Sequence, residues 1–198
     1  MKTQKNKNHL LIMLIFGMTI VPFIIAWGLK ENPHLVSGQT NHGQLIKPVV
    51  TTERSDLSGY DQFSNDNLKE LSGHWLIVNI IKGSECNNVC IEAMTKTKQL
   101  RLMLNKELTR TRRAVLVLKD VEPAVAGKWW QGDDTLLKIK PSKEFLQKLN
   151  SLPSGSLSDG MIFVMDPIGN LMMRYEPGFN PYDVKSDLLH LLRISQIG

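Results

Sequence analysis

The chain has 198 residues, of which 42% are hydrophobic and 22% charged. This is the composition of a protein that buries a core, and it excludes an intrinsically disordered chain. Most of the net charge of +5 comes from the first 30 residues, because residues 31–198 carry 20 basic and 19 acidic groups. A nucleic-acid-binding surface needs a concentrated basic face, so the charge distribution excludes that class of partner.

An uncharged run of 20 residues occupies positions 10–29. A helix of about 20 apolar residues crosses the ~30 Å hydrocarbon core of a bilayer. We therefore predict a transmembrane helix over residues 10–29, with Trp27 at a membrane interface. Three lysines and no acidic residue precede the run. By the positive-inside rule, residues 1–9 are then cytoplasmic and the chain after the helix lies outside the cytoplasm.

A cleaved secretory signal is the competing interpretation of this segment. Ala26-Trp27-Gly28 offers a small-x-small cleavage site. The apolar run is longer than the ~7–15 residues of a typical signal peptide, and a bulky tryptophan lies inside the site, so we favour the transmembrane helix. Either interpretation delivers the following residues to the same oxidising compartment.

The segment after the helix, residues 30–71, is polar and rich in Ser, Thr, Asn, Asp and Gly, without a sustained period. We predict a juxtamembrane linker or irregular segment there. Within it, residues 44–50 could form a short edge strand or an extended arm, since Pro48 removes a hydrogen-bond donor from any ladder. The globular domain is predicted to occupy residues 72–198.

A strand, a helix and a second strand open this domain. Residues 75–81 (WLIVNII) are a continuous apolar run, which predicts a central strand buried on both faces. Residues 86–108 carry an apolar stripe at helical spacing. Residues 113–118 predict a second buried strand, parallel to the first because the crossover helix requires it. The basic cluster at residues 110–113 is interpreted as the solvated beginning of that strand.

A tryptophan pair interrupts the next segment, residues 119–140, which has Gly-Asp turns and no clear period. Adjacent side chains on a strand point to opposite faces. One of Trp129 and Trp130 could therefore pack inside while the other is exposed as a partner contact. A core tryptophan beside a loop is the more ordinary interpretation.

The remaining elements complete an α/β order. Ser142 predicts the N-cap of a short helix, and residues 161–165 and 171–175 flank a Pro- and Gly-containing turn that predicts a β-hairpin. Asn180 and Pro181 predict the N-cap and first residue of a C-terminal helix. The resulting order, β-α-β-α-β-β-α, is that of a thioredoxin-like domain, here preceded by one transmembrane helix.

Cys86 and Cys90 are the only cysteines. On a helix, side chains four residues apart share a face, and their Cα separation of about 6 Å fits a disulfide. The pair follows the central strand at the start of the next helix, where free amide groups and the helix dipole stabilise a thiolate. We therefore predict that Cys86 and Cys90 form a reactive redox pair.

Three roles are open to the cysteine pair. A structural disulfide is ordinary outside the cytoplasm, but closing a loop of about four residues constrains the unfolded chain little. A redox couple could exchange disulfides with partner proteins. Two thiolates could instead hold Cu(I), a metal that prefers soft sulfur ligands. Zinc is less suitable because structural zinc sites use four ligands.

This arrangement resembles the Sco-type (Sco/SenC) proteins of cytochrome c oxidase assembly. The shared features are an N-terminal anchor, a CxxxC after the first core strand (Cys86 to Cys90) and a late DPxG turn (Asp166 to Gly169). The resemblance covers residues 73–194. It implies an assembly factor on the bacterial inner membrane with its domain in the periplasm, and it implies copper as the metal that Cys86 and Cys90 could hold.

The chain departs from the Sco pattern at two positions. Ile91 follows the second cysteine, where those proteins have proline, and Ser158 aligns with the histidine that completes their copper site. The chain is therefore a divergent relative, and its third copper ligand is not identified. His34 and His42 lie on the predicted linker, where a lone histidine is usually solvated.

The sequence thus predicts a membrane-anchored, extracytoplasmic factor that handles thiols and disulfides or copper during respiratory oxidase assembly. Its protein partner would be an oxidase subunit or another assembly factor. An assembly role is favoured over a metabolic enzyme, with thiol–disulfide oxidoreductase activity left open. The alternative is a non-catalytic thioredoxin-like scaffold that binds a membrane partner and keeps the disulfide as a local clamp.

Overall fold

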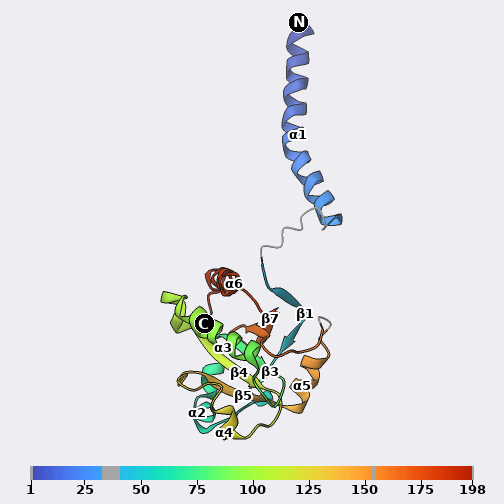
Figure 1. Ribbon diagram of the computed structural model, residues 1–198. Coiled ribbons are helices and arrows are strands. Elements are labelled where there is room, and N and C mark those ends of the chain that lie inside the picture. Colours follow the sequence, from blue (N-terminus) through green and yellow to red (C-terminus); the bar gives the residue numbers. More distant parts are fainter. Residues whose placement is uncertain (1, 33–40, 153–154, 198) are drawn as a thin grey trace. The chain divides into compact units, whose positions relative to one another are not determined.

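The computed structural model describes residues 2–32, 41–152 and 155–197. By their internal contacts, the residues form two units, which divide between Thr40 and Asn41. The first unit contains helix α1 (Lys2–Glu31), and the second contains a β-sheet with its surrounding helices (Figure 1).

Helix α1 contains a candidate membrane span. Its segment Leu11–Glu31 has 21 residues and is long and apolar enough to cross a bilayer, and no other helix in the described ranges meets that condition. The large side chains of this segment are exposed, among them Phe16, Phe23 and Trp27. The same composition is found in N-terminal signal sequences, so α1 fits both interpretations of the sequence.

A seven-stranded mixed sheet forms the centre of the second unit, with strand order β1-β7-β6-β3-β4-β5-β2. Strand β3 pairs in parallel with β4 and antiparallel with β6, so it lies in the middle of the sheet. In chain order the strands are β1 (Gln44–Thr51), β2 (Leu57–Gly59), β3 (Trp75–Ile81), β4 (Thr111–Val117), β5 (Leu137–Pro141), β6 (Ile162–Met165) and β7 (Asn170–Tyr175).

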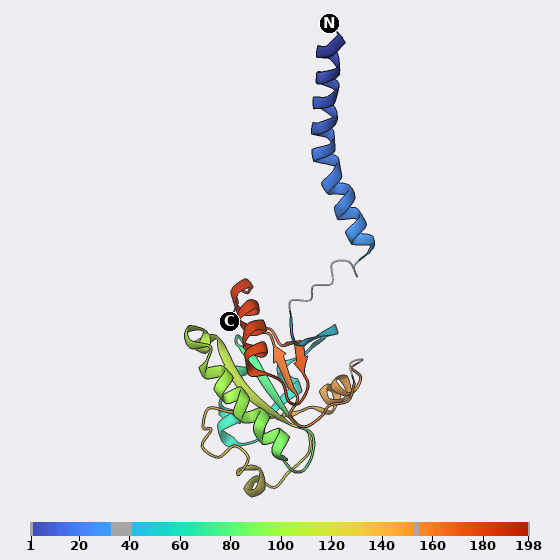
Figure 2. The ribbon, with the colours of Figure 1, turned by 45° about the horizontal axis from the view of Figure 1, so that its top comes forward.

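Helices cover both faces of this sheet. On one face, α3 and α6 lie side by side (Figure 2), and they pack on alternate residues of β3 such as Ile77. On the other face, Phe145 and Leu149 of α5 pack on Leu76 and Val78. The helices are α2 (Gln62–Asp66), α3 (Asn88–Leu102), α4 (Pro123–Ala126), α5 (Lys143–Asn150) and α6 (Pro181–Ile194), with short 3₁₀ helices η2 (Arg54–Asp56), η3 (Leu68–Leu71) and η4 (Asn105–Arg110).

Local sequence signals explain the core elements. All seven residues of β3 are buried, as the apolar run predicts for a strand covered on both faces. Ser142 caps α5 by accepting a hydrogen bond from the Phe145 amide, and Asn180 caps α6 by accepting one from the Tyr182 amide. The predicted thioredoxin-like order of strands and helices is therefore present.

The region assigned to an irregular linker, residues 30–71, is only partly irregular. From Asn41 onward it belongs to the domain, because β1 pairs with β7 and β2 pairs with β5 at the two edges of the sheet. The domain therefore begins at Asn41 and not at residue 72. Both strands pair with residues 80 or more positions away in the sequence. The edge strand offered for residues 44–50 is confirmed as β1, whereas the three residues of β2 form no local pattern.

Three further expectations are wrong. The segment 119–140 overlaps β5 (Leu137–Pro141), a strand that was not predicted because its LKIKP sequence has only five residues and ends in proline. Trp129 and Trp130 lie in a turn after α4 and not on a strand, and both are half-buried. The predicted helix 86–108 is divided into α3 and η4, and α3 begins only at Asn88.

Candidate functional site

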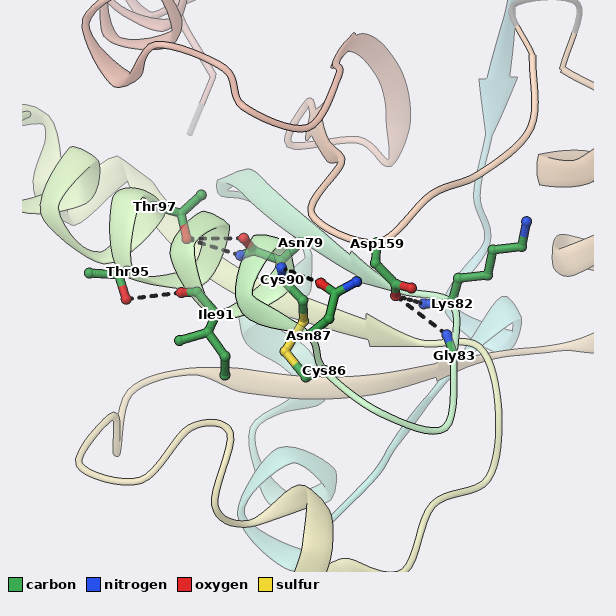
Figure 3. The surroundings of a disulfide bond; sticks show 10 residues. All are labelled: Asn79, Lys82, Gly83, Cys86, Asn87, Cys90, Ile91, Thr95, Thr97 and Asp159. Carbon is green, nitrogen blue, oxygen red and sulfur yellow. Dashed lines mark hydrogen bonds between the residues drawn. A yellow bond between two sulfur atoms is a disulfide. The ribbon is translucent and has the colours of Figure 1, made fainter.

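Cys86 and Cys90 form a disulfide where the central strand β3 leads into α3 (Figure 3). Their Cα atoms are 5.3 Å apart, close to the separation expected from the sequence. Cys86 lies in the loop before the helix, and Cys90 is the third residue of α3. The two side chains therefore do not share a helical face, which corrects the geometry that we predicted for the pair.

Asn87 decides where the helix begins. Its side-chain Oδ1 accepts a hydrogen bond from the Cys90 amide at 3.0 Å, so Asn87 is the N-cap of α3. Asparagine is among the most favoured N-cap residues because its side chain satisfies an amide that the helix leaves free. This signal was present in the sequence between the cysteines, and it places Cys90 in the first turn of α3.

The two sulfur-bearing residues differ in exposure. Cys90 is 1% exposed and packs with Ile81 and Met94 in a buried apolar cluster. Cys86 is only half-buried at the edge of the same cluster. A reacting group that arrives from solvent therefore meets Cys86, while Cys90 is shielded by the core.

The loop before β6 holds the cysteine loop in place. Asp159 Oδ1 accepts a hydrogen bond from the Lys82 amide at 2.7 Å and a longer one from the Gly83 amide at 3.4 Å (Figure 3). Next to it, Gly160 has φ +79°, and a Cβ at that position would lie 2.9 Å from the carbonyl oxygen of Val89. Glycine thus allows the β6 loop to approach the first turn of α3 closely.

The donor atoms here differ from the copper site that the Sco resemblance implies. Ser158 offers no imidazole, and Asp159 uses its carboxylate on backbone amides. Within the described ranges, no three His, Cys, Asp or Glu side chains lie close enough together to hold a metal. The donors that fit Cu(I) are the two sulfurs of Cys86 and Cys90, and they become available as thiolates only after the disulfide is reduced.

A buried polar network lies between α3 and the sheet. Arg113 of β4 is 3% exposed, and its guanidinium contacts Asp133 at 2.6 Å. It also donates to Thr97 Oγ1 and to the Met94 carbonyl, while Thr97 exchanges hydrogen bonds with Asn79 of β3. Burial lowers the pKa of Arg113, and the bond to Asp133 opposes that shift. The solvated role expected for the basic cluster is therefore wrong at Arg113.

His42 is held by α6 and is not a free linker histidine. Its ring Nδ1 lies 3.0 Å from Asp187 Oδ1, and its backbone amide donates to Asp187 Oδ2. Asp187 also accepts hydrogen bonds from the Gly43 amide and the Tyr175 hydroxyl. No local pattern indicates this contact, because His42 and Asp187 are 145 positions apart. His34 lies outside the described residues.

The chain was compared with family models, curated proteins and solved structures. A family model described as "Transmembrane-like, thioredoxin-like, C-terminal domain" matches residues 75–195, which span β3 through α6 and include both cysteines. A comparison with curated proteins found no matching sequence.

Several solved structures share the fold at low sequence identity. Yeast Sco1 with copper bound is 13% identical with a TM-score of 0.52, covering 77% of this chain and 93% of that one. Apo Sco1 from Thermus thermophilus is 16% identical with a TM-score of 0.54, covering 78% and 99%. BsSco, described as a Sco-family cytochrome c oxidase assembly protein with a disulfide switch, is 14% identical with a TM-score of 0.52, covering 77% and 100%. The domain therefore has the thioredoxin-like fold of Sco proteins.

Proposed function

Because the chain belongs to the family of transmembrane-like, thioredoxin-like C-terminal domains, we propose that it is a membrane-anchored thiol–disulfide factor of respiratory oxidase assembly. One observation carries the proposal: the Cys86–Cys90 disulfide lies at the end of the central strand, with one sulfur-bearing residue accessible and the other shielded. The oxidase assignment rests on the fold shared with Sco proteins, one of which is described as an oxidase assembly protein.

The accessible position of Cys86 suggests the order of the reaction. A partner thiolate attacks Cys86 Sγ and forms an intermolecular disulfide, while the Cys86–Cys90 bond breaks and Cys90 leaves and takes up a proton. A second partner thiol then displaces Cys86. The partner's two thiols are thereby oxidised to a disulfide and their protons pass to Cys86 and Cys90. The reverse sequence reduces a partner disulfide.

Copper handling is the second candidate, favoured by the two adjacent sulfurs. After reduction, Cys86 and Cys90 supply two soft thiolate ligands whose Cα atoms are already 5.3 Å apart. Copper is bound in the yeast Sco1 structure that shares this fold. The two candidate functions are compatible, because reduction of the disulfide is the step that makes the thiolate ligands available.

The location proposed for the domain is the periplasmic side of the bacterial inner membrane. Helix α1 supplies the single-pass anchor, and the lysines that precede the apolar run favour a cytoplasmic N-terminus. A disulfide persists in the periplasm, whereas cytosolic thiols are kept reduced. The partner is then a protein of the same membrane or compartment, such as an oxidase subunit or another assembly factor.

Redox titration and metal titration of the full-length chain in detergent test this proposal. We expect glutathione buffers to open and re-form the disulfide reversibly, as measured by thiol alkylation. We expect anaerobic Cu(I) titration with X-ray absorption to detect two sulfur ligands in the reduced protein. The double variant Cys86→Ser, Cys90→Ser should lose both properties, whereas Ser84→Ala, an exposed change in the same loop, should keep them.

The scaffold alternative makes opposite predictions. If the disulfide only clamps the loop, the double serine variant should support oxidase assembly in cells as well as the unmodified chain does. If the protein neither exchanges its disulfide nor binds Cu(I), both the thiol–disulfide proposal and the copper proposal are refuted. Exchange without copper binding would retain the first proposal and remove the second.

A further inference from the structure

Asp159 fastens the beginning of the cysteine loop, which we define as residues 82–87. Lys82 and Gly83 follow β3 directly, and their amides donate to Asp159 Oδ1 at 2.7 and 3.4 Å. In Figure 3 the Asp159 side chain reaches from the segment before β6 to these two amides. Backbone amides beyond the end of a strand need an acceptor, and this carboxylate supplies it.

The segment that carries Asp159 is itself held in place. The Ile80 amide donates to the Met161 carbonyl at 2.9 Å, which continues the pairing of β3 with β6. Gly160 lies so close to α3 that a Cβ there would be 2.8 Å from the Val89 side chain. Contacts with β3 before the cysteine loop and with α3 after it therefore place Asp159, and neither contact involves the disulfide.

The middle of the cysteine loop has little support of its own. Asn87 caps α3 and so fixes the last residue of the loop. Ser84 and Glu85 are exposed, and neither makes a hydrogen bond within the part of the chain that the structure describes. The position of Cys86 therefore depends on the two ends of the loop, which Asp159 and Asn87 hold.

We propose that Asp159 is a positioning residue that keeps Cys86 beside Cys90 while the disulfide is open. The inference rests on the proposed thiol–disulfide function and adds to it a residue outside the CxxxC motif. In the reduced protein, Asp159 holds the cysteine loop near the conformation that the disulfide requires, so closure orders few additional residues. Without Asp159, the untied segment grows from residues 84–86 to residues 82–86, and closure must order it.

This positioning acts on the last step of the exchange reaction. When the reduced chain attacks a disulfide, Cys86 Sγ forms a mixed disulfide and the other sulfur of the attacked disulfide leaves as a thiolate and takes up a proton. Cys90 then loses its proton and attacks Cys86 Sγ, the bond to the partner sulfur breaks, and the partner thiolate is protonated in turn. Because both cysteines belong to one chain, the rate of this step depends on how often Cys86 lies beside Cys90.

Glutathione equilibria of the full-length chain in detergent test the inference. The reduced chain and oxidised glutathione give the Cys86–Cys90 disulfide and two molecules of reduced glutathione, and alkylation with mass spectrometry measures each protein species. We expect Asp159→Ala to lower this equilibrium constant about tenfold, which corresponds to ~30 mV. Ordering the backbone of about one residue changes an equilibrium constant by a factor of that size. The mixed disulfide of Cys86 with glutathione should also accumulate in this variant, because closure is slower.

Three further variants separate positioning from charge and from damage to the fold. Asp159→Asn keeps an oxygen that accepts from the two amides, so its equilibrium constant should stay within about twofold of that of the unmodified chain. Glu85→Ala is the matched control, because it removes a carboxylate from the cysteine loop itself without removing an acceptor from the amides, and it should leave the constant unchanged. If Asp159→Ala does not fold, Asp159→Glu keeps the charge but places the oxygens one methylene farther out, and it should lower the constant in the same direction.

The outcomes separate this inference from the proposed function. If glutathione opens the disulfide of the unmodified chain but Asp159→Ala has the same equilibrium constant, the inference is overturned and the proposed function stands. If Asp159→Asn lowers the constant as much as Asp159→Ala does, the carboxylate acts through its charge, and positioning is overturned. If glutathione cannot open the disulfide in any of these proteins, the proposed thiol exchange is refuted and the inference with it.

Discussion

Asp187 connects the beginning of the domain to its last helix. The carboxylate is 3% exposed at its side chain, yet it accepts hydrogen bonds from two backbone amides and the Tyr175 hydroxyl and contacts the His42 ring. Burial alone would raise the pKa of Asp187, but its hydrogen bonds, from the Gly43 amide first, outweigh burial and lower it. Asp187 is therefore a charged anchor for the residues that precede β1.

This anchor gives the domain a predictable pH dependence. The hydrogen bond to Asp187 raises the pKa of His42 above its ordinary value, and the charges of Asp187 and Asp183 add to this shift while desolvation opposes it. A raised histidine pKa contributes stability that is complete below the unfolded value and is lost as pH rises through the folded value. The lowered Asp187 pKa acts in the opposite direction, since its contribution is lost as acid protonates the carboxylate.

We therefore expect His42→Gln to lower the melting temperature of the full-length chain more at pH 6 than at pH 8. The charged contact is formed at pH 6 and weakens as His42 deprotonates. Thermal unfolding in detergent at the two pH values measures the difference. His190→Gln serves as a control because His190 is exposed on α6, the helix that carries Asp187. An equal effect of His42→Gln at both pH values would contradict a stabilising contact between charged His42 and Asp187.

At the scale of elements, the turn between α4 and β5 depends on one buried ion pair. The Arg113–Asp133 and Lys140–Asp120 pairs both have N···O distances of 2.6 Å. The side chains of the first pair are 3% and 11% exposed, whereas those of the second pair are 37% and 91% exposed. At the same N···O distance, the two ion pairs therefore contribute differently to the free energy of unfolding. Removing one partner of a buried pair leaves an uncompensated charge in the core, whereas water replaces an exposed partner.

We expect Asp133→Ala to lower the free energy of unfolding by about 3 kcal/mol, because it leaves the Arg113 guanidinium buried without a countercharge. Asp120→Ala should leave stability unchanged within error. Urea unfolding of both variants, followed by tryptophan fluorescence, makes the comparison. The Asp133 variant should also shift the native emission, since the ion pair secures the turn that carries Trp129 and Trp130. Equal stability of the two variants would refute this account.

For the complete chain, we expect α1 to remain attached to the domain as a membrane anchor. A transmembrane α1 should keep the chain in the membrane fraction after extraction with alkaline carbonate, and protease should reach the domain only from the periplasmic side. Cleavage at Ala26-Trp27-Gly28 would instead release a soluble protein of lower mass. Intact-mass spectrometry of the protein from cells distinguishes these outcomes, and we expect the full mass in the carbonate-resistant fraction.

Elements defined by local pattern were predictable from sequence. The apolar run of β3, the caps Ser142 and Asn180, and the turn between β6 and β7 follow from residues that are adjacent in the chain. The same information identified the CxxxC pair. Asn87 was an available signal as well, and its cap corrects the beginning of α3.

Local patterns were enough to predict the thioredoxin-like order, the candidate membrane helix and the position of the cysteine pair, because each depends on short-range periodicity or spacing. Tertiary structure decided the rest. Strand β2 pairs with a strand 80 or more positions away, and buried Arg113 is satisfied by Thr97, the Met94 carbonyl and Asp133, which lie 16 to 20 positions away. Packing around Cys90 also decided which cysteine solvent reaches, since burial depends on residues brought together from several elements.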